Sequence, residues 1–267
     1  MEGARGTRER SRLSPPPLPS RTGEPCLWMS AGLLAYRLCD RDFDCDSCPL
    51  DAALRGASLP AGSPLRPPGA APFEAPPDRL YDRRHVWVQR RARRREGGRS
   101  GDRSRVRLGL DAFAVALVWP ITGVVWRAPE GPLAAGSALC DLELTGGHLP
   151  VVTPVSGRLL ARNRGLEADA SLLADSPYDE GWLVELEEAP AAGGEVREGG
   201  GGLAGAAEAA ERSRLDLRRF RRRAALFLLE GSEAAGPTLA DGGQVLTDLR
   251  VILGPGRYLE LVRDLLT

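Results

Sequence analysis

The stretch Leu142–Gly157, LELTGGHLPVVTPVSG, decides the fold of this 267-residue chain. Residues 138–144, which run into it, alternate between two faces, as a half-buried β-strand requires. Gly146 and Gly147 follow, and paired glycines supply the positive φ angles of a tight turn before a return strand at Val151. The sequence therefore predicts a β-hairpin whose tip is exposed to solvent.

Segments on both sides of this hairpin resemble the H protein of the glycine cleavage system. PVSG at residues 154–157 ends the hairpin, and DSPYDEGWL follows at residues 175–183. Upstream, HVWV at residues 85–88 and VRLGLDAFA at residues 106–114 are similar to the first two strands of that family. Several separate motifs thus occur in the order that the family has them.

The resemblance covers residues 80–190, a typical length for one domain, and implies the fold class. Members of the family have a lipoyl-type barrel-sandwich hybrid, a mainly β fold in which two small sheets form a flattened barrel. They carry an aminomethyl group on a lipoyl arm, which is attached to a lysine at the tip of such a hairpin.

The hairpin tip departs from the family pattern. Counting back from Pro154 places Glu143 on the family's glutamate and Gly146 on its lipoyl lysine, and the whole chain contains no lysine. Arginine cannot replace that lysine, because its guanidinium stays protonated and delocalised. We therefore expect no lipoate. His148 is a possible substitute functional group, since imidazole titrates near neutral pH, although a histidine on a hairpin tip is more often simply solvated.

Three further segments of this domain have predicted structures. The longest uncharged run, Ala112–Trp126, is shorter than the roughly 20 residues that a membrane-spanning helix needs, and we expect buried strand there. Residues 166–173 predict a short helix and residues 182–187 a last strand. We expect Trp182 and Tyr178 to be mainly core residues, because large aromatic side chains dominate burial.

The composition excludes several classes of protein. The net charge is zero and the isoelectric point is about 6.8, so no overall field attracts nucleic acid or an acidic membrane. An arginine-rich run at residues 90–103 falls in a hairpin loop without interleaved aromatic residues, which favours a solvated tip over nucleic-acid binding. Five cysteines without a secretory segment predict a cytoplasmic protein.

Four of the cysteines lie in one short module, residues 25–57. Cys26, Cys39, Cys45 and Cys48 are separated by spacers of twelve, five and two residues. Four thiolates suffice for one tetrahedral metal site, and so short a module has too little core to fold without a staple. The sequence therefore predicts a metal site formed by these cysteines.

The identity of the metal stays open between zinc and an iron-sulfur cluster. Cys48-Pro49 resembles the end of a ferredoxin-type run, whereas zinc sites with long spacers are common. A plainer alternative makes Cys26 and Cys39 small buried hydrophobes and the other two a redox pair. Nearby aspartates oppose reactive thiols, because their field raises thiol pKa values unless a metal offsets it: Asp40, Asp42, Asp44, Asp46 and Asp51.

The remaining segments complete the predicted domain organisation. We expect disorder at residues 1–24, a proline-rich linker at 58–79, a glycine- and alanine-rich linker at 191–206 and a helical tail at 207–267. The tail has three amphipathic segments, the first beginning at a capping box formed by Ser213 and Asp216. That helix has a basic side, predicted to be a solvated face or a contact for an acidic protein: Arg218, Arg219, Arg221, Arg222 and Arg223.

These observations favour a binding protein over an enzyme, because the domain has no recognisable catalytic set. The leading hypothesis is a non-lipoylated adaptor or scaffold related to the H protein, with the docking surface at residues 143–147. The resemblance implies the glycine cleavage enzymes or lipoyl-attaching enzymes as partners. The alternative is an iron-sulfur redox or regulatory protein, and an active aminomethyl carrier is opposed by the missing lysine.

Overall fold

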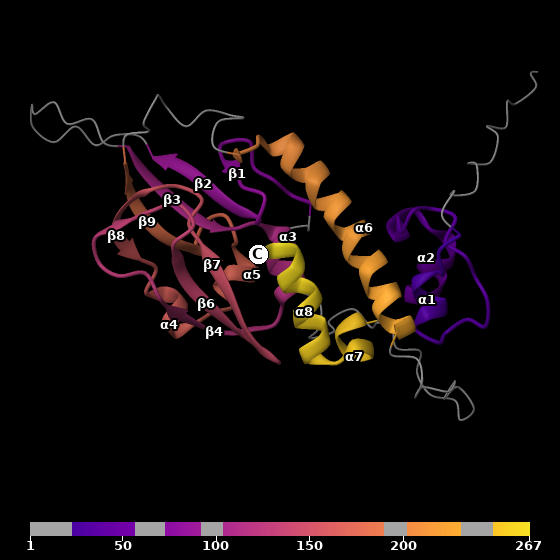
Figure 1. Ribbon diagram of the computed structural model, residues 1–267. Coiled ribbons are helices and arrows are strands. Elements are labelled where there is room, and N and C mark those ends of the chain that lie inside the picture. The colour runs from indigo at the N-terminus through magenta and orange to yellow at the C-terminus, as the bar shows by residue number, and fades with distance from the viewer. Residues whose placement is uncertain (1–22, 57–72, 92–103, 190–201, 231–247) are drawn as a thin grey trace, which may run out of the picture.

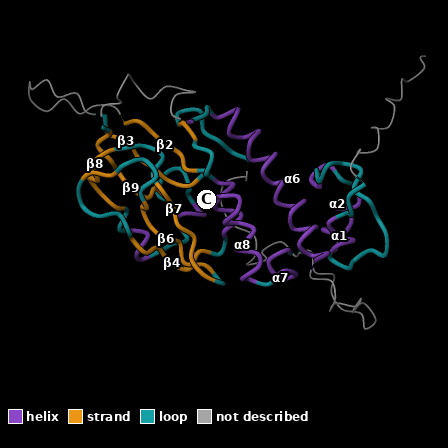
Figure 2. Tube along the Cα trace, viewed as in Figure 1, coloured by secondary structure: helices purple, strands orange, loops and turns teal. Residues whose placement is uncertain are grey.

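The computed structural model describes residues 23–56, 73–91, 104–189, 202–230 and 248–267 (Figure 1). Most of the predicted disordered terminus, of both predicted linkers and of the arginine-rich run lies outside these residues. Residues 23–24 of that terminus are described, and Arg90 and Arg91 belong to a strand. Strands gather on one side of the molecule, a long helix runs diagonally away from them, and a small cysteine-containing module lies at the far end of that helix (Figure 2). No described helix has the length and apolar character that crossing a bilayer requires.

The strands form two antiparallel sheets. The larger sheet has the strand order β1-β2-β3-β9-β8-β5. Its strands are β1 (Leu80–Tyr81), β2 (Val86–Arg91), β3 (Arg105–Leu110), β5 (Pro132–Leu133), β8 (Gly157–Arg162) and β9 (Trp182–Glu188). The smaller sheet has the order β4-β6-β7, with β4 (Ile121–Trp126), β6 (Ala138–Leu144) and β7 (Gly147–Val152).

The mainly β class implied by the resemblance is present, and the strands form two sheets, as expected for the flattened barrel; closure of these sheets into one barrel is not found among the described strands. The strand ladders remain divided between two sheets of six and three strands. One hydrophobic core cluster joins them, with inward-facing residues from both: Val106, Leu108, Val184 and Leu186 on the larger sheet, and Cys140, Leu142, Leu149 and Val151 on the smaller. Packing across this core, and not closure of one ladder, therefore unites the two sheets.

The predicted hairpin is formed by β6 and β7. Leu144 pairs with Gly147 and Glu143 with His148, so the turn is as tight as the paired glycines require. Gly146 and Gly147 have φ angles of 102° and 144°, which L side chains rarely adopt. The return strand begins at Gly147, earlier than the predicted Val151, because the ladder continues up to the turn.

The prediction of strand throughout residues 112–126 is wrong in its first half. Residues 112–118 form helix α3 (Ala112–Val118), and strand β4 follows. Asp111 caps the helix, because its side chain accepts a hydrogen bond from the backbone N–H of Ala114. A run that is buried on all sides has no period to separate helix from strand, which explains the error.

Two short helices replace the single helix predicted at residues 166–173. They are α4 (Gly165–Ala168) and α5 (Leu172–Asp175). Leu166 and Leu173 are buried, so the apolar signal in the sequence was correct although the helix is interrupted. The last strand, β9, is where the sequence predicts it.

The aromatic residues Trp87 and Tyr178 join the two ends of this domain. The Trp87 indole N–H donates to the backbone oxygens of Leu110 and Pro177, each at 3.0 Å. Gly109 is required beside it, because a Cβ there would overlap the indole ring. Tyr178 is buried, as predicted, whereas Trp182 is half-buried and carries the Arg107 guanidinium 4.6 Å from its ring centre.

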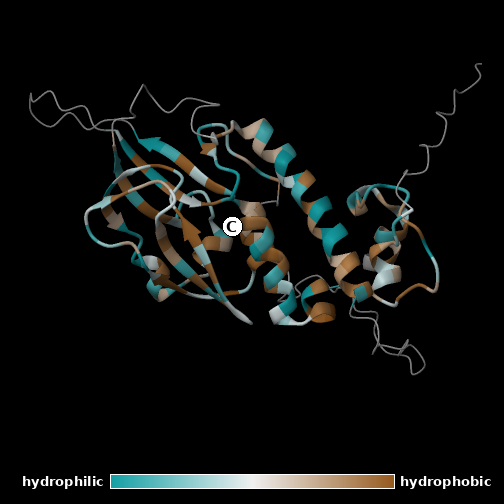
Figure 3. Cartoon of the chain, viewed as in Figure 1, coloured by the Kyte–Doolittle hydropathy of each residue, from teal (hydrophilic) through white to brown (hydrophobic). Residues whose placement is uncertain are grey.

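Three helices are described in the predicted tail: α6 (Ala206–Glu230), α7 (Leu249–Leu253) and α8 (Pro255–Leu266). Helix α6 begins at Ala206, so Ser213 and Asp216 are not its capping box. Both residues lie in the interior of the α6 segment and both side chains are buried. The Ser213 hydroxyl donates to the Ala209 carbonyl oxygen. Hydrophobic and hydrophilic residues are interspersed along α6 and α8 (Figure 3). Phe220, Ala224, Leu259 and Val262 are buried, whereas Leu215, Leu226 and Leu229 of α6 are exposed.

The cysteine module contains three short helical elements. They are α1 (Leu27–Ser30), the 3-10 turn η1 (Cys45–Ser47) and α2 (Pro49–Gly56). Helix α1 lies against α6, and Leu27 and Phe43 belong to the main hydrophobic core cluster. The module therefore packs on the tail helix instead of standing apart as the predicted linkers suggest.

Candidate functional site

Helix α8 covers one side of the hairpin tip. A Cβ built on Gly146 would lie 2.8 Å from the carbonyl carbon of Pro255, at the start of α8. A Cβ built on Gly147 would lie 3.0 Å from Cδ2 of Leu259. Residue 146, which the sequence predicts to match the family's lipoyl lysine, keeps exposed surface, but a Cβ there would overlap Pro255 while α8 is docked. The tip is exposed at Thr145, Gly146 and His148, as predicted, although α8 lies against one side of it.

Polar contacts hold the end of α8 to the same hairpin. Arg263 donates to the backbone carbonyl oxygen of His148 through Nη2 at 2.5 Å and through Nε at 3.2 Å. The His148 residue is otherwise exposed. The backbone carbonyl of His148 therefore binds Arg263 of α8, whereas its imidazole is a solvated group on the surface.

Helices α7 and α8 are also anchored at the end of α3. The Tyr258 hydroxyl donates to the carbonyl oxygen of Leu117 at 2.9 Å, and Arg250 Nη1 donates to that of Trp119 at 2.6 Å. Val262 is fully buried in the core. These contacts make α7 and α8 a fixed part of the surface around the tip.

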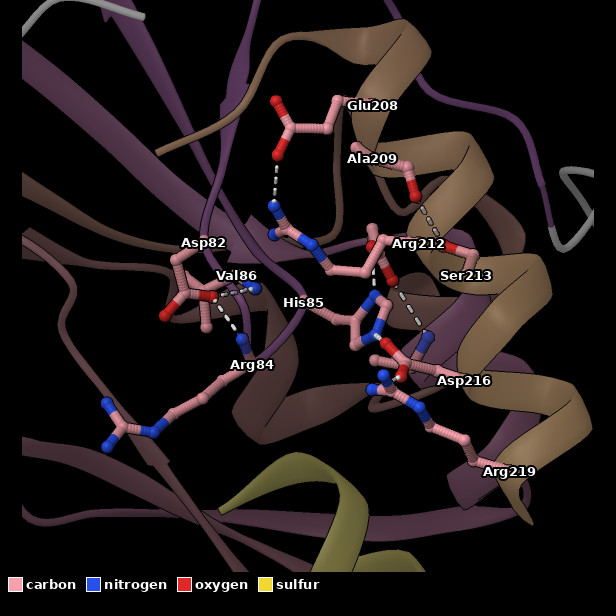
Figure 4. A network of polar contacts seen from close by, with 12 residues as sticks. Asp82, Arg84, His85, Val86, Glu208, Ala209, Arg212, Ser213, Asp216 and Arg219 are labelled. Atoms are coloured by element: carbon pink, nitrogen blue, oxygen red, sulfur yellow. Dashed lines mark hydrogen bonds and ion pairs between the residues drawn. The ribbon is translucent and has the colours of Figure 1, made fainter. Parts of the chain in front are cut away.

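A buried histidine links helix α6 to the sheets (Figure 4). His85 Nδ1 lies 2.8 Å from Oδ2 of Asp111, and Nε2 lies 3.3 Å from Oδ2 of Asp216 on α6. Only 2% of His85 is exposed. Burial alone lowers the pKa of His85, but the two carboxylates outweigh it and raise the pKa to about 9. A protonated imidazole thus bridges two acids.

The geometry of this histidine gives it a structural role. His85 has a φ of 63°, and its ring lies 4.5 Å from that of Phe113, so the backbone and the ring are both held by their surroundings. The bridge has no need of contact with solvent, because His85, Asp111 and Asp216 are all buried. The sequence predicts His85 only as the start of a strand, because its two partners are far away along the chain.

The four cysteines of the module line one small cavity. Cys26, Cys39, Cys45 and Cys48 all border it, together with apolar residues that include Phe43. Burial raises the pKa of the Cys26 thiol, with Cys39 and Cys48 as further contributors. Among the residues that the structure describes, however, no three His, Cys, Asp or Glu side chains are arranged to hold a metal ion. The thiols are gathered but not in ligand geometry.

Arginines of α6 bind the acidic residues beside these cysteines. Arg221 is 5% exposed and donates to both carboxylate oxygens of Asp46, at 3.0 and 2.8 Å. Arg218 lies 3.0 Å from Asp44. The negative field predicted around the thiols is therefore offset in part by arginine, and the expectation that a metal has to offset it was incomplete.

The basic side of α6 accordingly has an acidic partner within the chain. Arg222 contacts Glu24 at the start of the module at 2.5 Å, in addition to the pairs made by Arg218 and Arg221. The sequence predicted a solvated face or a contact for a separate acidic protein. For these three arginines, contact with the cysteine module replaces both predictions. Arg223 instead pairs with Asp264 of α8.

Comparison with known proteins identifies the family of the central domain. The family model described as "Glycine cleavage H-protein" matches residues 79–198. The "Glycine cleavage system H protein" of Mycobacteroides abscessus is 33% identical over 119 residues, which cover 45% of this chain and 83% of that protein. This chain belongs to the glycine cleavage H-protein family. The H protein of Mycolicibacterium gilvum is 32% identical over 114 residues, covering 43% of this chain and 79% of that protein.

A solved H protein also aligns with the chain. The crystal structure of the glycine cleavage system H protein from Mycobacterium marinum has 26% sequence identity and a TM-score of 0.40, and covers 51% of this chain and 97% of that one. The H-protein match at residues 79–198 excludes the cysteine module and helices α6–α8. The elements that cover the hairpin tip thus lie outside the residues that the family model matches.

Proposed function

We propose that this chain is a non-lipoylated member of the H-protein family that acts as an adaptor between proteins. The observation that carries the proposal is the contact between Gly146 and Pro255. The residue matching the lipoyl lysine has no side chain, and helix α8 occupies the space where a side chain would begin. With no lysine in the sequence, a carrier role has no anchor for its arm.

The hairpin and α8 together form the surface that this adaptor offers to partners. Glu143 is half-buried on β6, and Thr145 and Gly146 are exposed beside the start of α8. We propose the glycine cleavage enzymes or the lipoyl-attaching enzymes as partners, since the family's docking surface lies at residues 143–147. On this proposal the protein is not an enzyme and works in the cytoplasm, in keeping with five cysteines that form no disulfide among the described residues.

The cysteine module supplies the adaptor with a metal site in this proposal. Cys26, Cys39, Cys45 and Cys48 border one cavity, and metal binding would require their four sulfurs to converge there. Zinc bound in this way staples a module that has little core of its own. Arg221 supports the site, because its charge balances Asp46 next to the thiolates.

The experiment for the adaptor is a pull-down with the intact chain as bait and purified glycine cleavage and lipoyl-attaching enzymes as prey. The adaptor proposal expects one of these enzymes to be retained, and Thr145→Arg to abolish retention, because residue 145 is exposed at the tip. Leu160→Arg is the matched control, since Leu160 is 41% exposed on β8 and is not part of the hairpin tip. Retention of none of these enzymes contradicts the proposed partners.

A second candidate function is supported by the apolar surroundings of the thiols. Leu27, Trp28 and Phe43 border the cysteine cavity and are almost fully buried. Such a lining suits an iron-sulfur cluster, whose potential depends on burial and on hydrogen bonds to sulfur. The backbone N–H of Phe43 already donates to Sγ of Cys39 at 3.3 Å. Iron with acid-labile sulfide in protein purified without oxygen supports this redox or regulatory function; one zinc and a colourless protein supports the structural site.

A further inference from the structure

An apolar cavity of about 400 Å³ lies between the hairpin tip and the tail helices. It is separate from the cysteine cavity and from the His85 bridge. Its walls come from the end of α3, the end of β6 and helices α7 and α8, and include Trp119, Leu144, Thr145, Val251, Tyr258 and Leu259. A volume of this size is within the range of roughly 300–1,000 Å³ that small-molecule sites occupy.

Two polar side chains on the cavity wall, those of Tyr258 and Arg250, already have partners inside the protein. The Tyr258 hydroxyl donates to the Leu117 carbonyl oxygen. Arg250 is the one charged side chain on this wall; it donates to the Trp119 carbonyl oxygen and binds the Asp248 carboxylate at 2.7 Å. An occupant therefore gains nothing from a buried charge, and a buried polar group on it would lack a partner.

We propose that this cavity binds an uncharged alkyl or acyl chain of medium length. Such a chain matches the apolar wall and brings no polar group into the interior. Its polar end stays at the opening, where Thr145 and Val251 are exposed. This site goes beyond the adaptor function, because it does not depend on a protein partner or on the state of the cysteines.

The site has a consequence for the docking of the tail. Leu144 and Thr145 belong to the hairpin, whereas Tyr258 and Leu259 belong to α8, so an occupant contacts both sides. A ligand that binds only when both sides are in place stabilises the docked arrangement by mass action. Occupation therefore favours the state in which α8 covers Gly146.

Quenching of tryptophan fluorescence by 8-bromooctan-1-ol tests the proposal on the full-length chain. Bromine quenches a tryptophan that it contacts, and Trp119 is the tryptophan on the cavity wall. We expect saturable quenching that plain octan-1-ol reverses by competition. Trp119→Phe removes the saturable component, since the other four of the five tryptophans lie elsewhere.

A rim variant distinguishes the cavity from the general surface. Val251→Phe narrows the opening at a residue that is 49% exposed, so the fold tolerates the change. We expect the half-saturating concentration of the quencher to rise about tenfold. Leu160→Phe is the matched control, because Leu160 is 41% exposed on β8, away from the cavity. We expect this substitution to leave the quenching unchanged. Quenching of the wild-type chain that never saturates, or that octan-1-ol does not reverse, overturns the proposal.

Discussion

The carbonyl carbon of Pro255 lies 2.8 Å from the point at which a side chain on Gly146 would begin. Real Cβ atoms do not approach backbone atoms so closely, so the first turn of α8 and a side chain at residue 146 exclude each other. The position that we expect to match the lipoyl lysine thus has no side chain, and the first turn of α8 lies where one would begin, although Gly146 itself keeps exposed surface. Both features favour an adaptor over a carrier.

Gly146→Lys tests this exclusion directly. The substitution strains a backbone with a φ of 102° by about 1–3 kcal/mol, and it adds the overlap with Pro255, which we expect to cost about another 1–3 kcal/mol. Gly131→Lys is the matched control, because Gly131 has a φ of 117° with no atom within 4 Å of a built Cβ. Urea unfolding measures both; equal losses of unfolding free energy would show that α8 does not press on the tip.

The ion pair between Arg221 and Asp46 predicts how firmly the cysteine module is held. Arg221→Ala leaves a partly buried carboxylate without its bidentate partner; since Asp46 is still 54% exposed, we expect a loss of only about 1–2 kcal/mol. Arg223→Ala breaks an exposed pair with Asp264 and is expected to cost less than about 0.5 kcal/mol. A double-mutant cycle with Asp46→Ala measures the coupling energy between Arg221 and Asp46. A coupling energy of zero would show that this ion pair does not hold the module to α6.

Stability is expected to depend on the protonation of His85. Its folded pKa of about 9 exceeds the ordinary value of 6.5, so the bridge to Asp111 and Asp216 contributes fully below about pH 6.5. The contribution is lost as the pH rises through 9. The shift in the pKa of His85 corresponds to roughly a few kcal/mol of unfolding free energy. His85→Asn keeps the positive φ, which asparagine tolerates, and removes this dependence. Unfolding free energies between pH 6 and pH 10 measure it; identical slopes for both proteins refute the bridge.

Metal content is expected to follow four of the five cysteines. Cys26→Ser, Cys39→Ser, Cys45→Ser and Cys48→Ser each remove one proposed ligand, so we expect the bound zinc or iron to be largely lost. Cys140→Ala is the internal control, because Cys140 is buried on β6 outside the cysteine cavity and should leave the metal content unchanged. Elemental analysis checks this. A wild-type chain without metal eliminates the site.

The sequence was most informative where local pattern and structure agree. Gly146 and Gly147 specify a tight turn by themselves, and β6 alternates from Cys140 to Glu143, so the hairpin was predictable. The predicted faces fail at the start of β6, where Leu139 and Cys140 are both buried because the register with β7 shifts between Ala138 and Cys140. Asp111 carried a usable signal that the strand prediction ignored, since an aspartate before an apolar run is a common helix cap.

Long-range contacts could not be predicted in the same way. Nothing near Gly146 indicates that Pro255 covers it, and nothing near His85 indicates that Asp216 completes its bridge. The basic side of α6 was visible, but charge alone does not distinguish solvent, another protein and the chain's own Asp46 as a partner. These relationships depend on how distant segments pack.

The most direct test of the central claim is the intact mass of the chain after expression in cells with active lipoate attachment. We expect the mass of the unmodified sequence, 28.6 kDa, because the chain offers no lysine and α8 covers residue 146. A known lipoylated H protein expressed in the same cells confirms that the attachment machinery works. A chain whose mass is raised by one lipoyl group, on any residue, would contradict the account and restore the carrier function.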